Sequence, residues 1–327
     1  MTNHARRLVF FFLGQLVTLL ALEWLVRRNE HLFAAASHRA LTKVAMFETH
    51  RNVELLFLGT SRTQDGVSPA LVAESLKGIA PGVGALPGFN AAFTGSSLDS
   101  LISLAPRFSS RTGLRLVVVE FSAPQIINEP VSWEEPAVPD GTLEDKLALA
   151  ARNIRFIRYR KAFIPENLNR LPKLLIFAPS LGGWETRTSD QIAAWLGRKE
   201  TPAANFDPAK WSPELFTPAG APMPLDQADE RIASAIQSLI RQFEGHGIKV
   251  AFAVPPLSRS YPPVQERDRM RALFSEVARR GRCEVWNFAS LSLPDGLFRD
   301  PSHLGVAGRA EYSAALAKQV ARILRNE

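Results

Sequence analysis

Residues 53–63 read VELLFLGTSRT, and this stretch decides the fold. Its first six residues are apolar except for Glu54, which is typical of a short strand buried on both faces of a parallel sheet. The run ends in a turn of small residues, Gly59-Thr60-Ser61. In sheets of parallel strands, reactive side chains lie at the carboxyl ends of the strands. We therefore expect Ser61 at the edge of a sheet where a site forms.

Apolar runs and amphipathic stretches alternate along the rest of the chain. Ser68 and Pro69 supply an N-cap and a first-turn proline for a helix over 69–78. The last helix, over 306–324, has apolar residues three or four positions apart on one face. This alternation predicts an α/β fold, a three-layer α/β/α sandwich around a five-stranded parallel sheet. The remaining strands are expected at 86–90, 115–121, 248–254 and 284–288, and a further helix near 96–97.

A long insertion separates the third and fourth predicted strands. Residues 122–225 are rich in proline and hold four of the six tryptophans. A structureless loop of this length is uncommon in a compact domain, so we expect a small helical cap beside the site. The tryptophans either form the core of this cap or bind a glycan or acyl group.

The N-terminal segment 8–26 reads LVFFFLGQLVTLLALEWLV and is flanked by pairs of arginines. It is long enough to cross about 30 Å of hydrocarbon as a helix. A cleaved signal peptide would have small residues directly after the apolar run, and here they come only at 34–36. We therefore predict a tip and membrane anchor over 1–29, a connector over 30–51 and one domain over 52–327. The equal flanking charges leave the orientation open.

Charge and cysteine content exclude several classes of function. The formal charge is 39 − 32 = +7, but the basic residues are scattered and no nucleic-acid-binding motif accompanies them. We expect no nucleic-acid partner; anionic lipid or an acidic glycan fits the charge better. The single cysteine, Cys283, has no Cys/His metal spacing around it, so we expect a small core residue and no metal.

A serine nucleophile requires a neighbouring base, because its hydroxyl is hardly ionised near neutral pH. Four of the six histidines lie before residue 51, and His246 stands between two glycines at a predicted helix end. His303 remains, in FRDPSHLGVAG (298–308). Asp300 can accept from one imidazole nitrogen and so fix the tautomer in which the other takes the Ser61 proton. The alternative is a helix-capping loop with a solvated histidine.

Three segments together resemble the sequence blocks of the GDSL/SGNH hydrolase family, over most of 53–315. LFLGTSRT resembles the first block, which implies Ser61 as nucleophile. NAAFTGSS (90–97) resembles the second, N-x-x-x-x-G, which implies Gly95 as a backbone oxyanion donor and Asn90 as a supporting residue. DPSHLGVAG resembles the last block and implies that Asp300 and His303 complete the triad.

The third block of the family departs from its pattern in this chain. The family has Gly-x-Asn-Asp after the third strand, with the Asn donating to the oxyanion. Here the sequence is VVVEFSAPQ (117–125), with Pro124 at that position. Proline has no N–H, and one lost donor typically costs about 3–4 kcal/mol of transition-state stabilisation. Gln125, Asn128 or a cap residue is the candidate substitute.

The GTSRT opening, the apolar N-terminus and the missing block are similar to a membrane-tethered subgroup. This subgroup includes alginate O-acetylation proteins and their relatives in lipoteichoic-acid D-alanylation. The resemblance implies a serine esterase or O-acyltransferase without cofactor, acting on acyl groups, expected to be acetyl, of an extracytoplasmic polysaccharide. It also implies a single-pass inner-membrane protein with a periplasmic catalytic domain and partners in envelope polysaccharide modification.

Two other functions stay open, and so does the role of one arginine. The first alternative is a non-catalytic module that binds glycan or scaffolds an export complex. The second is a lipase-like enzyme on the inner membrane face. Arg62, next to the nucleophile, either forms a surface salt bridge or orients an acidic group of the substrate.

Overall fold

The structure is a computed structural model that describes residues 3–28, 39–50, 52–84, 86–122, 225–258, 275–276, 278–279, 283–291 and 293–325. The described residues up to Ala45 belong to one compact unit, and those from Met46 onward belong to a second. The predicted cap, with its four tryptophans, lies outside the described residues except at its two ends. Residues 30–38 of the predicted connector lie outside them as well, and the rest of the connector contains α3 (Arg39–Thr49).

The second unit is built on a five-stranded sheet in which every neighbouring pair is parallel. Its strand order, β2-β1-β3-β4-β5, is that of flavodoxin-like doubly wound proteins. The sequence prediction of an α/β sandwich on five parallel strands is thereby confirmed. The strands are β1 (Leu55–Leu58), β2 (Gly88–Asn90), β3 (Leu116–Glu120), β4 (Lys249–Val254) and β5 (Glu284–Asn287).

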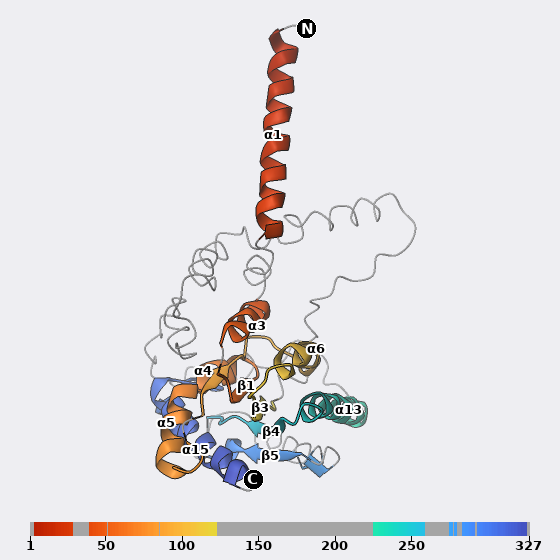
Figure 1. Cartoon of the computed structure of the whole chain (residues 1–327). Helices are drawn as coiled ribbons and strands as arrows, with labels where there is room; N and C mark the ends of the chain where they lie inside the picture. The colour runs from red at the N-terminus through yellow and green to blue at the C-terminus, as the bar shows by residue number, and fades with distance from the viewer. Residues whose placement is uncertain are drawn as a thin grey trace. The chain divides into compact units, whose positions relative to one another are not determined.

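Helices cover both faces of this sheet (Figure 1). α5 (Pro69–Ile79) packs with α15 (Val306–Arg325) on one face, and α6 (Leu98–Ser109) packs with α13 (Leu225–Glu244) on the other. Serine caps begin two of them, since the Ser68 side chain accepts from the Leu71 N–H and the Ser97 side chain from the Ser100 N–H.

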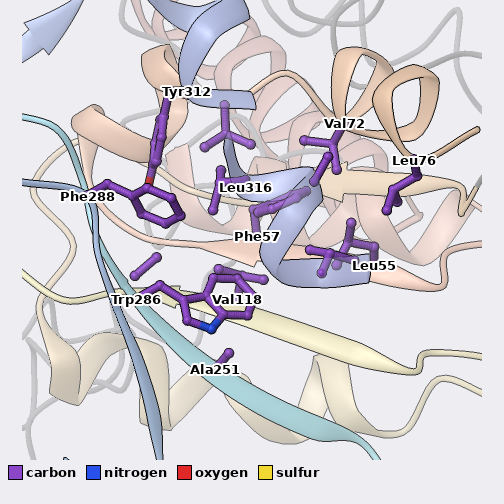
Figure 2. Close-up of a cluster of buried hydrophobic side chains, with 14 of the residues drawn as sticks. Leu55, Phe57, Val72, Leu76, Val118, Ala251, Trp286, Phe288, Tyr312 and Leu316 are labelled. Atoms are coloured by element: carbon purple, nitrogen blue, oxygen red, sulfur yellow. The ribbon is translucent and has the colours of Figure 1, made fainter. Parts of the chain in front are cut away.

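One hydrophobic core lies between the sheet and the pair α5 and α15. Side chains of a strand alternate between faces, so Leu55 and Phe57 of β1 point to the same layer. Figure 2 shows them beside Val118, Leu76 and Leu316, which come from β3, α5 and α15. Leu56 and Leu58 of β1 are also fully buried. This two-sided burial fixes the end of β1, and with it the turn that carries Ser61.

The N-terminal helix α1 (Asn3–Arg28) has a different character. Within the described part of the chain, one helical segment, Val9–Arg28, is long and apolar enough to cross a membrane. Its large side chains are exposed, among them Phe10 and Trp24. An exposed apolar helix near the N-terminus is the property of a membrane anchor or a signal sequence.

Candidate active site

The turn that carries Ser61 joins β1 to the short helix α4 (Ser61–Gly66). Thr60 is the N-cap of this helix, and its hydroxyl accepts from the Arg62 N–H at 3.2 Å. Gly59 allows the chain to pass close to β3, because a Cβ there would lie 2.6 Å from the Cβ and Oε2 of Glu120. Ser61 is therefore held at the carboxyl end of a central strand and is half-buried.

The other half of the site comes from a small hairpin after β5. β6 (Phe298–Asp300) and β7 (His303–Leu304) pair antiparallel, with Asp300 opposite His303. The tight connection between them brings the two side chains together on one side of the turn. The sequence predicts a loop here, and the structure instead has this two-stranded hairpin.

Ser61, His303 and Asp300 form a continuous hydrogen-bonded series. The Oγ of Ser61 lies 2.8 Å from Nε2 of His303, and Nδ1 of His303 lies 2.8 Å from Oδ1 of Asp300. When Nδ1 carries the proton and donates it to Asp300, Nε2 is free to accept the Ser61 proton. The heavy-atom distances are those that direct proton transfer requires.

Asp300 is held by backbone as well as by the imidazole. Its Oδ1 accepts from the N–H groups of Ser302 and His303, both at 2.9 Å. Burial disfavours the ionised carboxyl and is the largest single influence on its pKa. The hydrogen bond and charge of His303, with the two backbone donors, together outweigh it, so the pKa of Asp300 lies below its usual value. The carboxylate is thus kept ionised to orient the imidazole.

The loop after β2 carries Gly95, whose backbone N–H the family resemblance implies as an oxyanion donor. Gly95 has a φ of 79°, a left-handed conformation that favours glycine. Within the described ranges, neither the N–H of Ser61 nor that of Gly95 donates to a protein acceptor. Both N–H groups are therefore unengaged, one in the turn that carries Ser61 and one in the loop after β2.

Asn90 supports the site from the end of β2. Its side chain is buried, and its Nδ2 donates to the carbonyl oxygens of Thr63 and Val67, both at 2.9 Å. Its Oδ1 accepts from the Ala92 N–H at 3.1 Å. Both amide hydrogens are occupied, so Asn90 braces α4 and donates nothing to an oxyanion.

Arg62 is buried beside the nucleophile, with 9% of its surface exposed. Among the described residues its guanidinium has no hydrogen bond or ion pair, and the surface salt bridge considered from the sequence is absent there. Pro124 and Gln125, which concern the third oxyanion donor, lie outside the described residues.

Glu120 is a residue of the site that the sequence analysis does not single out. It ends β3, is 1% exposed, and its carboxylate accepts hydrogen bonds from the turn that carries Ser61. The available signal is a single acidic residue closing an otherwise apolar strand, in LVVVE. A buried carboxylate at the sheet edge beside Ser61 is uncommon, because glutamate is rarely fully buried unless it is paired.

The environment of Cys283 is that of a structural thiol. Cys283 is half-buried, slightly more open than the core position expected from the sequence, and burial raises the pKa of its thiol to about 11. A thiol of this kind is a poor nucleophile at neutral pH. Over the described residues, no group of three or more His, Cys, Asp or Glu side chains is arranged to hold a metal ion.

Comparison with known proteins gives only remote likenesses. No protein-family model and no curated protein matches the chain. Among solved structures, a Bacteroides fragilis protein described as an acylhydrolase is 10% identical, with a TM-score of 0.39, over 83% of this chain and 86% of its own. The acetyl xylan esterase AlAXEase is 11% identical, with a TM-score of 0.43, over 82% and 100%. A GDSL-like lipase from Bacteroides thetaiotaomicron is 11% identical, with a TM-score of 0.42, over 89% and 99%.

These identities and TM-scores are too low to assign a function. The class of the protein therefore rests on its own strand order and side-chain geometry. It is a doubly wound α/β protein with Ser61, His303 and Asp300 joined by hydrogen bonds at the carboxyl edge of the sheet.

Proposed function

We propose that this chain is a membrane-anchored serine esterase or O-acyltransferase of the SGNH type. It acts on acyl groups, expected to be acetyl, of an extracytoplasmic polysaccharide, and segment 8–26 anchors it in the inner membrane. The main support for the proposed catalytic activity is the 2.8 Å contact between Ser61 Oγ and His303 Nε2.

The first half-reaction acylates the serine. Ser61 Oγ attacks the carbonyl carbon of the acyl ester while its proton passes to Nε2 of His303. The carbonyl oxygen becomes an oxyanion that accepts from the N–H groups of Ser61 and Gly95. The intermediate then collapses, the carbon–oxygen bond to the alcohol breaks, and His303 returns the proton to the leaving alkoxide.

The second half-reaction releases the acyl group. Water or a sugar hydroxyl gives its proton to His303 and attacks the acyl-enzyme carbonyl. The ester bond to Ser61 Oγ breaks and the serine regains its proton. Water as the acceptor gives an esterase and a sugar hydroxyl gives a transferase, and the same three side chains serve both.

Arg62 favours an acidic substrate. The Arg62 side chain is mostly buried and its guanidinium has no protein partner among the described residues, so it is available to pair with a carboxylate of the substrate. The net charge of +7 also favours an acidic substrate. We therefore place an acidic glycan ahead of a neutral one, with envelope polysaccharide-modification proteins as partners.

A fluorophosphonate probe tests the nucleophile. We expect the wild type to be labelled and Ser61→Ala to be unlabelled, with hydrolysis of p-nitrophenyl acetate falling in parallel. Ser110→Ala is the matched control, because Ser110 is exposed at the end of α6 and should leave labelling unchanged. Circular dichroism melting checks that each variant is folded. A folded wild type without labelling would reject the enzyme and leave a module that binds glycan or scaffolds an export complex.

A further inference from the structure

The carboxylate of Glu120 is buried where β3 passes the nucleophile turn. In the parallel register of β1 and β3, Leu58 pairs with Val119, so Glu120 comes level with Gly59. The close approach depends on that glycine, because a Cβ at position 59 would lie 2.6 Å from the side chain of Glu120. Gly59 and Glu120 therefore form a matched pair at the edge of the sheet.

Four donors from two segments satisfy this carboxylate. Its Oε2 accepts from the N–H of Thr60 at 2.7 Å and from the N–H of Thr63 at 3.2 Å. Its Oε1 accepts from the hydroxyls of Thr60 at 2.7 Å and Ser122 at 2.5 Å. A buried carboxylate is tolerated when its oxygens are satisfied in this way.

The other N–H groups of the turn around Ser61 all have acceptors. Those of Thr60 and Thr63 donate to Glu120, and that of Arg62 donates to the Thr60 hydroxyl. The N–H of Gln64 donates to the Thr60 carbonyl at 3.0 Å. The N–H of Ser61 stands between occupied neighbours and has no acceptor among the described residues.

We propose that Glu120 is a positioning residue for the oxyanion site. It fixes the N–H groups on both sides of Ser61, so that the Ser61 N–H alone stays directed at the developing oxyanion. This inference rests on the proposed function of Ser61. In a site where Pro124 replaces a donor of the third block, a rigid Ser61 N–H carries a larger share of oxyanion stabilisation.

The central variant is Glu120→Gln, which keeps the shape of the side chain. Its amide nitrogen cannot accept from the two N–H groups, and if it faces the hydroxyls of Thr60 and Ser122 instead, both hydroxyls must reverse and accept from it. In either orientation the negative charge and one accepting oxygen are lost. We expect kcat for p-nitrophenyl acetate to fall about 10²-fold or more, with KM nearly unchanged, because an oxyanion donor acts mainly in the transition state. Glu74→Gln, on the exposed side of α5, is the matched control and should leave both constants unchanged.

Rates are expressed per active site by titration with the fluorophosphonate probe, so that loss of folded protein does not lower kcat. If Glu120→Gln does not fold, a comparison of Thr60→Val with Thr60→Ser tests the positioning role instead. The valine removes the hydroxyl that links Arg62 N–H to Glu120 and should lower kcat about tenfold or more, whereas the serine keeps it and should restore the rate.

The outcomes separate the two proposals. If the wild type is active and Glu120→Gln keeps kcat within about threefold of it, the positioning role alone is overturned. Where Glu120→Gln does not fold, the same result for Thr60→Val overturns it. A folded wild type without Ser61-dependent turnover would overturn the proposed function and this inference together. A fall in kcat with KM preserved in the glutamine variant, or in Thr60→Val but not Thr60→Ser, supports the positioning role.

Discussion

At the scale of single residues, one oxygen of Asp300 organises the catalytic loop. Its Oδ1 binds the imidazole Nδ1 and two backbone N–H groups of the same turn, at 2.8 and 2.9 Å. The aspartate therefore sets the conformation of the loop and the tautomer of His303 at the same time. Its replacement should affect both stability and rate.

We expect Asp300→Asn to lower kcat by about 10³–10⁴-fold, because an amide can hold the imidazole in the wrong tautomer. The variant should also be less stable near neutral pH. The pKa of Asp300 lies below its usual value in the folded protein, so the stabilisation is complete above the usual aspartate range near pH 3.9. It is lost as the pH falls through the lowered pKa of the folded state.

Urea unfolding of wild type and Asp300→Asn between pH 7 and pH 2 measures this dependence. The difference in unfolding free energy should be constant above about pH 5 and shrink in the acid range. Asp295→Asn removes the same charge outside the triad and serves as the control. A difference that does not change down to pH 2 would contradict the depressed pKa.

Ser61, Asp300 and His303 can be predicted from the sequence because their signals are local. Ser61 directly follows a buried strand, and the aspartate and histidine are three residues apart in one loop. Glu120 cannot be found in this way, since its function depends on the register between β1 and β3. Asn90 is only partly predictable. The sequence indicates its position at the end of β2, but its hydrogen bonds to Thr63 and Val67 follow from the way β2 packs against α4.

At the scale of elements, the start of α15 fixes the loop that carries His303. Gly308 lies in the first turn of this helix against the 3-10 helix η6 (Asp295–Leu297). A Cβ at position 308 would lie 2.4 Å from the Leu297 carbonyl oxygen and 2.8 Å from Cδ2 of Leu304. Backbone atoms cannot give way as a flexible side chain does, so the helix itself would have to shift.

We therefore expect Gly308→Ala to lower the free energy of unfolding by about 1–3 kcal/mol, the usual cost of overpacking. The rate should fall as well, because His303 is five residues away on the same loop. Gly296→Ala is the matched control, since a Cβ at position 296 meets no atom within 4 Å. Thermal melts and esterase assays of both variants measure the effect, and equal melting temperatures would show that α15 has room to adjust.

Apolar runs made β1, β3 and β4 predictable, whereas β2 and β5 are less apolar and each is marked by one buried aromatic residue, Phe89 and Trp286. Their ends were less well determined: the run 284–288 stops as a strand at Asn287, and Phe288 begins a 3-10 helix, η5 (Phe288–Ser290). The hairpin of β6 and β7 was not predicted. Strands of three and two residues are too short to show an alternating pattern, so pairing across the turn defines them.

At the scale of the whole molecule, the proposed membrane anchor α1 would set the compartment in which the α/β unit works. We expect the full chain to stay with the membrane fraction after a carbonate wash, and a C-terminal alkaline phosphatase fusion to be active. The double variant Leu16→Arg and Leu20→Arg should weaken insertion by about 2.5–3.5 kcal/mol per arginine near the helix centre. Arg6→Lys, outside the apolar run, is the control.

The same experiment separates the alternatives for the N-terminus. A shortened chain in the soluble extract would identify a cleaved signal sequence in place of an anchor. An inactive phosphatase fusion on an intact, membrane-bound chain would place the C-terminus in the cytoplasm and exclude chemistry on envelope glycans.

The separation of Ser61 and His303 along the chain also has a kinetic consequence. The two residues in hydrogen-bond contact are 242 positions apart in sequence. Closing a loop of this length costs about 5 kcal/mol of chain entropy, and pairings of distant segments form slowly. The nucleophile and its base should therefore meet late in refolding, after the strands have paired. The return of catalytic activity would then lag behind the return of secondary structure and report the final step.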